Sequence, residues 1–124
     1  MGLSQKINWG VAVIGLWEAL APFILGYSFI AAALANALVI GITIIILAAW
    51  AGLTSNLISE RTLDWVIAVL GLWLIAAPFV LGYSDLTIAM WNAIIVGVVV
   101  AGLEIWAALS VPSPTQVGDF GQQD

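Results

Sequence analysis

The sequence has no cysteine and no histidine, and among its 124 residues only two are basic and seven are acidic. The missing residue types exclude disulfides, thiol chemistry, acid–base catalysis by histidine and the usual zinc, copper and haem ligand sets. The charged fraction is 7%, against about 25% in an ordinary soluble domain, which excludes a water-exposed globular surface.

Two basic residues cannot form a phosphate-binding stripe, so we expect no nucleic acid partner. The sequence also lacks a Gly-rich phosphate loop, paired carboxylates on one helix face, a serine nucleophile with its base and a cluster of metal ligands. We therefore expect no catalytic activity, no metal and no cofactor.

What the chain does contain is apolar: hydrophobic residues make up 64% of it and gather in four long runs. The runs cover residues 9–27, 30–53, 65–83 and 87–109. An α-helix rises about 1.5 Å per residue, so each run is close to the roughly 30 Å needed to cross the hydrocarbon core of a bilayer. The sequence predicts an all-α membrane protein with four transmembrane helices.

The second half of the chain repeats the first. Shifting the sequence by 56 positions aligns residues 9–53 with residues 65–109 without a gap, and 21 of the 45 aligned pairs are identical. The matches include Gly-Leu-Trp, Ala-Pro-Phe and Leu-Gly-Tyr-Ser motifs. Each unit holds two spans, so both units enter the membrane in the same orientation, as tandem parallel repeats about an axis along the membrane normal.

Around these repeats we predict an N-terminal segment, a polar loop and a disordered tail. The predicted boundaries are 1–8 for the N-terminal segment, 9–53 for repeat 1, 54–64 for the loop, 65–110 for repeat 2 and 111–124 for the tail.

The charged residues near the span ends indicate the orientation. Lys6 and Arg61 flank the side that carries both termini, whereas the two hairpin loops have no basic residue. The positive-inside rule therefore places both termini in the cytoplasm. We expect Glu60 or Asp64 to neutralise Arg61, and Glu104 to reach water at this interface.

Proline interrupts the first helix of each unit, at Pro22 and at Pro78. It removes one backbone hydrogen bond and frees the carbonyl four residues earlier, so we predict a kink at each site. Asn36 and Asn92 each follow their proline by 14 residues and lie at the same depth. We expect each asparagine side chain to bond the broken turn of its own unit.

Small residues recur at every fourth position on the second helix of each unit, and they allow two helix backbones to approach closely. A cofactor groove is the alternative interpretation, but close helix packing is the ordinary one. The predicted packing seam consists of Ala33, Ala37, Gly41, Ala89, Ala93 and Gly97.

Glu18 lies about 13 Å inside the first span, while its counterpart in the second unit is the apolar Leu74. A charge at helix centre costs about 2.5–3.5 kcal/mol on insertion scales, and no basic residue lies within a span, so we expect the Glu18 carboxyl to be neutral. It is a candidate proton or ligand site. The alternative is a neutral group that bonds a neighbour such as the Trp17 or Trp73 indole, Thr43 or an adjacent subunit.

The doubled unit resembles the SPW repeat family of small bacterial and archaeal membrane proteins, named for a Ser-Pro-Trp motif in a two-helix repeat. Only the proline of that motif is kept here, in the triplets at 21–23 and 77–79. The surrounding residues follow the family: Gly-Leu-Trp at 15–17, Leu-Gly-Tyr at 25–27, and Asn36. The resemblance covers residues 9–109 and implies this architecture in a prokaryotic inner membrane, with no catalytic residue.

We therefore predict a non-catalytic integral membrane protein that is an accessory, assembly or scaffold subunit of a larger membrane complex, or a homo-oligomer. Its partners would be the lipid bilayer and other membrane subunits or further copies of the chain. The alternative is a small proton-coupled transporter or conducting module using Glu18. Such a module requires a water-reachable path to Glu18, whereas a subunit is expected to have a dry interior. Seven tryptophans motivate a third interpretation, a pigment- or quinone-associated subunit, whose tetrapyrrole would need a ligand other than histidine.

Overall fold

Four α-helices account for most of residues 2–112, the part of the chain that the computed structural model describes. Each helix is long and apolar enough to cross a membrane, and the described residues include no β-strand. The predicted all-α fold with four candidate spans is therefore confirmed. Apart from its first two residues, the predicted disordered tail lies outside the described residues. The helices are α1 (Leu3–Ile24), α2 (Ala31–Leu53), α3 (Leu57–Val80) and α4 (Thr87–Ser110).

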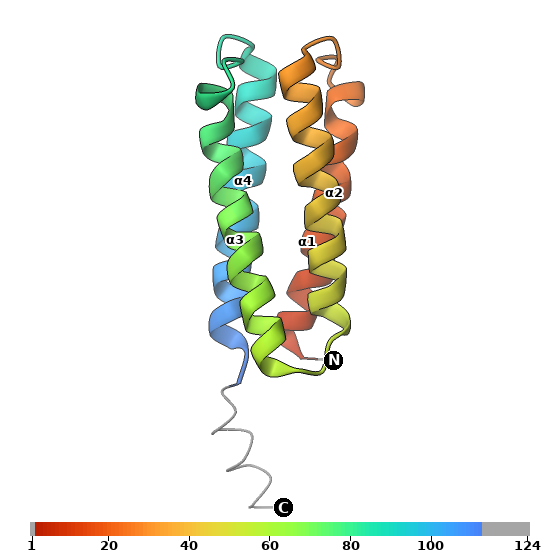
Figure 1. Ribbon diagram of the computed structural model, residues 1–124, viewed down its shortest axis with the longest axis vertical. Helices are drawn as coiled ribbons and strands as arrows, with labels where there is room; N and C mark the ends of the chain where they lie inside the picture. Colours follow the sequence, from red (N-terminus) through yellow and green to blue (C-terminus); the bar gives the residue numbers. More distant parts are fainter. Residues whose placement is uncertain (1, 113–124) are drawn as a thin grey trace, which may run out of the picture.

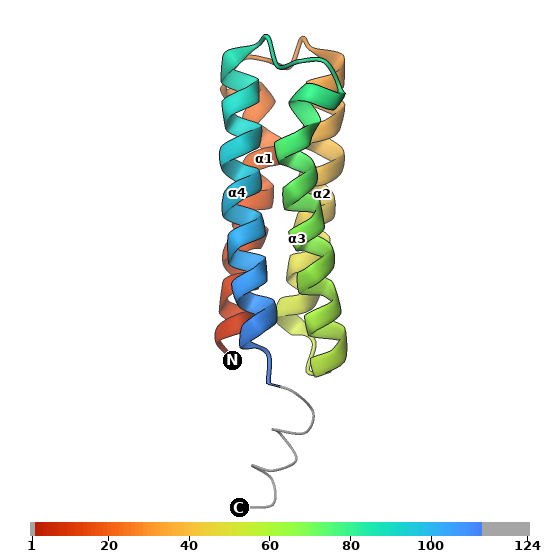
Figure 2. The same cartoon turned by 90° about the vertical axis from the view of Figure 1, so that its left-hand side faces the viewer.

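The helices run alternately up and down and follow one another around the bundle (Figures 1 and 2). The most extensive contacts are between α1 and α2 and between α3 and α4, so the molecule consists of two hairpins. The hairpins meet through α1 with α4 and through α2 with α3. The chain start, the α2–α3 connection and the end of α4 lie at one end of the bundle, here called the terminal end (Figure 1). The two hairpin loops lie at the other, the loop end.

Two helices extend beyond the predicted spans. Helix α1 begins at Leu3 and includes most of the predicted 1–8 segment. Helix α3 begins at Leu57, so the loop predicted over 54–64 is mostly helical. The reason is a cap: the side-chain oxygen of Asn56 accepts two of the first backbone N–H groups of α3, both at 3.0 Å. Such a cap supplies partners that the first helical turn lacks.

The two prolines lie in the last turns of α1 and α3, two residues before each helix ends. After Pro22 the chain turns at Gly26, which has a φ of +83°, a backbone conformation that favours glycine. The Tyr27 N–H then donates to the Pro22 carbonyl at 2.9 Å, as in a helix-ending Schellman motif. The second hairpin has the same turn, with a φ of +81° at Gly82 and the corresponding bond to Pro78.

All six residues of the predicted packing seam are buried, and its two glycines lie where the two helices of each hairpin touch. A methyl group added at Gly41 would lie 2.8 Å from the backbone nitrogen of Ala19 in α1. One added at Gly97 would lie 2.5 Å from the carbonyl oxygen of Gly71 in α3. Only glycine allows such close contact between the two backbones.

Candidate functional site

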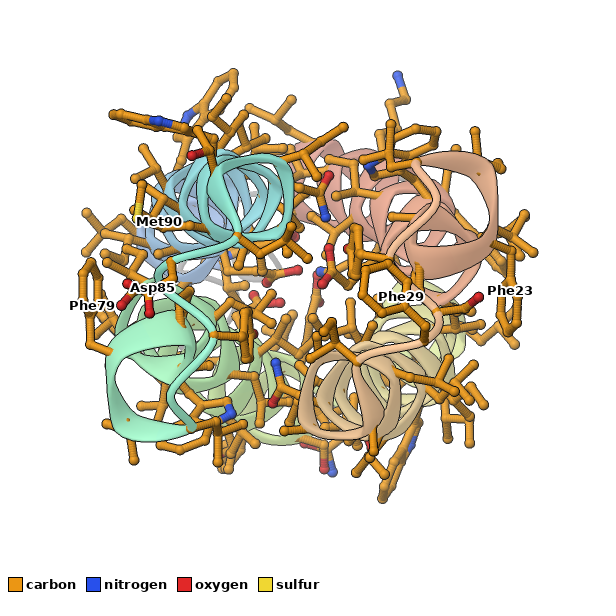
Figure 3. The ribbon with its side chains drawn as sticks, turned by 90° about the horizontal axis from the view of Figure 1, so that it is seen from above. Phe23, Phe29, Phe79, Asp85 and Met90 are labelled. Atoms are coloured by element: carbon orange, nitrogen blue, oxygen red, sulfur yellow. The ribbon has the colours of Figure 1, made fainter. Side chains whose placement is uncertain are left out.

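Polar side chains gather in the interior of the bundle, whereas the surface is mostly apolar. Seen from above, oxygen and nitrogen atoms cluster between the four helices, and most peripheral side chains are hydrocarbon (Figure 3). Phe23 and Phe79 point outward on opposite sides (Figure 3), and more than half of each side chain is exposed. The interior polar groups lie at two levels, which we treat in turn.

The first level, the loop-end layer, contains both asparagines predicted as site residues. The Asn36 amide donates to the Tyr83 hydroxyl at 3.2 Å and accepts from the Trp73 indole at 2.8 Å. Both partners belong to the other hairpin, so the prediction that Asn36 bonds its own broken turn is wrong. The reason is the rotation of each residue about the helix axis. Successive residues of a helix differ by about 100°, so Asn36 points in a different direction from the next residue, Ala37, which belongs to the buried seam. That rotation directs Asn36 toward α3.

Asn92 makes the reciprocal contacts with the first hairpin, which corrects the same prediction for the second unit. Its amide nitrogen donates to the Tyr27 hydroxyl at 3.1 Å and to Glu18 Oε2 at 3.0 Å. Its oxygen accepts from the Trp17 indole at 3.0 Å. Each asparagine thus holds one tyrosine and one tryptophan of the opposite hairpin, and the participating positions correspond under the 56-residue shift.

Glu18 is the residue of this layer that has no polar counterpart in the other repeat. It is only 2% exposed, and its counterpart Leu74 is fully buried. The neighbours considered for it from sequence have other partners: both indoles donate to asparagines, and the Thr43 hydroxyl donates to the Val39 carbonyl. The structure therefore places Glu18 in the interior, as expected, but its hydrogen-bond partner is Asn92.

The tyrosines of this layer lie in the hairpin loops, outside the four helices. Burial raises the pKa of Tyr83 to about 12 and also raises the pKa of Tyr27. Both hydroxyls therefore keep their protons at neutral pH. Each can accept from its asparagine and still offer its own O–H to another acceptor.

An apolar layer separates the loop-end layer from the second polar level. Its five central side chains are fully buried and belong to one hydrophobic cluster. Val11, Ile67 and Val100 lie, along α1, α3 and α4, between the polar residues of the two levels, while Leu74 follows Trp73 at the depth of its counterpart Glu18. The interior is therefore apolar at mid-height. These residues are Val11, Ile44, Ile67, Leu74 and Val100.

The second level, the terminal-end cluster, is one that we did not predict. The Ser4 hydroxyl donates to Glu60 Oε1, and the Asn8 amide donates to Asp64 Oδ1 at 2.7 Å. In each pair the two residues are separated by 56 positions, the same shift that relates the two repeats. The sequence contained a signal for this cluster. The 56-residue shift also pairs Ser4 with Glu60 and Asn8 with Asp64, so a polar residue matches a polar residue at both positions. The cluster consists of Ser4, Asn8, Glu60, Asp64 and Glu104, all buried.

Glu104 was expected to reach water, and the structure corrects this. Helix α4 continues to Ser110, so Glu104 lies well inside the helix and is completely buried. Its carboxyl group adjoins that of Asp64. Neither Glu104 oxygen has a hydrogen-bond donor among the described residues.

The expected neutralisation of Arg61 by a neighbouring carboxylate is also replaced by another contact. The Arg61 guanidinium donates to the backbone carbonyl of Val111. Glu60 and Asp64 instead accept from the uncharged side chains of α1, because they face the interior while Arg61 is only half-buried.

Four apolar helices of spanning length, with polar groups turned toward one another inside the bundle, define a four-span integral membrane protein. The SPW repeat domain matches residues 5–107. The chain therefore belongs to the SPW repeat family, as its sequence motifs predicted. The match includes Asn8, Asp64 and Glu104 of the terminal-end cluster. No curated protein and no solved structure matches the chain significantly.

Proposed function

We propose that this protein is a non-catalytic membrane subunit that assembles laterally with other membrane proteins or with further copies of itself. The apolar layer across the bundle interior is the observation that carries the proposal. A transporter needs a hydrated path, and the fully buried side chains at mid-height oppose one. The polar groups of the loop-end layer already bond one another, which opposes their use in binding a soluble substrate.

The surface supports lateral assembly. The three connections between helices are short, covering residues 25–30, 54–56 and 81–86. They present little area outside the membrane. The lateral surface has large apolar side chains on all four helices, among them Phe23, Ile46, Phe79 and Trp106, each more than half exposed. Partners within the bilayer would contact this surface through packing.

For orientation, we place the terminal end in the cytoplasm and the protein in a prokaryotic inner membrane. Lys6 and Arg61 are the only basic residues of the chain, and both lie near the terminal end. Two charges of one sign on one side follow the positive-inside rule.

The test is the assembly state of the full-length protein extracted from its native membrane in a gentle detergent. Native mass spectrometry after chemical crosslinking is expected to show a complex of fixed stoichiometry, either with a second membrane protein or with further copies of this chain. A strictly monomeric species under conditions that preserve a known membrane complex in the same sample would contradict the proposal.

A proton-coupled module that uses Glu18 is the second candidate. It is favoured by the hydrogen-bonded series that runs from the Glu18 carboxyl through Asn92 to the Tyr27 hydroxyl at the loop end. Liposomes that contain the purified protein and an internal pH-sensitive dye distinguish the two candidates. A subunit role predicts no proton flux above that of protein-free liposomes. Flux that disappears in Glu18→Gln would establish the second candidate instead.

A further inference from the structure

The terminal-end cluster contains more hydrogen-bond acceptors than donors. The buried acceptor atoms without a partner are Asn8 Oδ1, Asp64 Oδ2 and both carboxyl oxygens of Glu104. Buried polar groups in native proteins nearly always have a partner, because an unmade bond costs about 1–3 kcal/mol. Four unpartnered acceptors in one cluster therefore require a donor.

No further side-chain donor is hydrogen-bonded to these acceptors among the described residues, although Arg61 Nε lies buried nearby without a partner. The Asn8 amide uses its two N–H groups on Asp64 Oδ1 and on the Ser4 carbonyl. The Ser4 hydroxyl is used by Glu60, and Arg61 donates to a backbone carbonyl. In the part of the chain that the structure describes, no three His, Cys, Asp or Glu side chains are arranged to hold a metal ion.

We propose that the adjoining carboxyl groups of Asp64 and Glu104 bind one proton between them, and that this buried pair is a proton-binding site of the protein. One carboxyl is protonated and donates its O–H to the other, which remains a carboxylate. Two carboxyl groups that share a site cannot both ionise without a compensating cation. The proton engages two of the four atoms, one as donor and one as acceptor, and removes one of two adjacent buried charges.

The charges that face the pair support this assignment. Helix α3 contributes Glu60, whose negative charge disfavours a second ionisation, and Arg61, whose guanidinium is directed to a backbone carbonyl. Helix α1 contributes only the uncharged Ser4 and Asn8 at this level. Helix α2 has no titratable residue at all. The Arg61 charge acts on Asp64 from a distance, but its guanidinium donates to the Val111 carbonyl, so among the described residues no cation is hydrogen-bonded to the pair.

Loss of the proton has a mechanical consequence. It would leave Asp64 and Glu104 of the second hairpin both negative in the interior, with Asn8 of the first hairpin as the only donor to either. The cost of two uncompensated buried charges is relieved when water enters and the hairpins separate at the terminal end. The site therefore couples proton binding to the closure of the bundle at this end.

Infrared spectroscopy tests for the proton directly. The full-length protein in lipid vesicles is expected to show a protonated-carboxylic-acid carbonyl band at neutral pH that is lost in Asp64→Asn and in Glu104→Gln. Each replacement supplies an amide donor of nearly the same shape, so the remaining carboxyl ionises. Glu18→Gln is the matched control, because it alters a buried carboxyl in the other layer, and it should leave this band component unchanged. Retention of every carboxylic acid component in both Asp64→Asn and Glu104→Gln would overturn the proposal.

The pH dependence of unfolding gives an independent readout that does not require any variant to be fully native. A folded state that keeps a proton which the unfolded chain releases near pH 4 is most stable at low pH, and its stability falls as the pH rises. For one proton the unfolding equilibrium constant should rise about tenfold per pH unit over the neutral range. Because the neutral Glu18 carboxyl also keeps a proton on folding, the comparison is made in Glu18→Gln, where the pair's contribution should remain and should be lost when Glu104→Gln is added. A wild-type stability that does not change from about pH 5 to about pH 9 would contradict the shared proton.

Discussion

Asn8 and Asp64 occupy the same position in the two halves of the sequence, and their side chains are hydrogen-bonded to each other at 2.7 Å. Two identical units related by a twofold axis would bring this position against itself, as two asparagines or two aspartates. In a single fused chain the two copies differ, so one supplies a donor and the other an acceptor. Ser4 and Glu60 follow the same rule. The asymmetry thus lets a carboxylate face a neutral donor in the bundle interior.

The Asn8–Asp64 bond should therefore be important for stability. Asn8→Leu is expected to lower the free energy of unfolding by about 1–3 kcal/mol, because it leaves the buried Asp64 carboxyl without its donor. Denaturation in mixed micelles would measure the change. The double variant with both positions changed to leucine is expected to recover part of the loss, since it removes the Asp64 acceptor together with its Asn8 donor. A double variant less stable than Asn8→Leu alone would argue against this explanation.

The reciprocal bonds of the loop-end layer predict a specific pattern of coupling. Asn36→Leu and Tyr83→Phe should each destabilise the protein, by about 1–3 and about 0.5–1.5 kcal/mol respectively. A double-mutant cycle should show that the two losses are not additive, because the residues share one hydrogen bond. The cycle that combines Asn36→Leu with Tyr27→Phe is the control and should be additive. Coupling of Asn36 to Tyr27 rather than to Tyr83 would place the asparagine within its own hairpin.

The glycines of the seam predict a strong dependence on position. Gly97→Ala should destabilise the bundle by about 1–3 kcal/mol, because its new methyl group would lie 2.5 Å from the Gly71 carbonyl oxygen. Gly102→Ala, on the same helix, meets nothing within 4 Å and should stabilise α4 by up to about 1 kcal/mol through helix propensity. Thermal unfolding of both variants in one detergent compares them directly. Equal effects at the two positions would contradict the close contact.

Glu18 can be converted into its counterpart. Glu18→Leu places in the first unit the residue that Leu74 already has in the second, where it is fully buried. Asn92 keeps its bonds to Tyr27 and Trp17, so we expect the free energy of unfolding to stay the same or to increase, as when a buried polar group is replaced by a hydrocarbon. A melting curve measures it. A large loss of stability would show that the Glu18 carboxyl is needed to hold the loop-end layer together.

Sequence by itself was sufficient for the four spans, the family and the burial of Glu18 and of the seam residues. Each of these follows from hydrophobicity, from the length of a helix relative to a bilayer or from residue size, which are local properties. The same information gives depth along a helix, and it correctly placed Asn36 within α2 and Asn92 within α4.

Only the tertiary structure decided which residues meet across the bundle. Depth does not define the rotation of a helix about its axis or the order of helices around the bundle, and a step of one residue turns a side chain by about 100°. For that reason Asn36 bonds Tyr83 instead of its own hairpin, and Glu104 is buried beside Asp64 instead of reaching water. The Asn56 cap likewise extended α3 through a segment whose polar composition had indicated a loop. The polar residues there face the bundle interior, where their partners are supplied by helices distant in sequence.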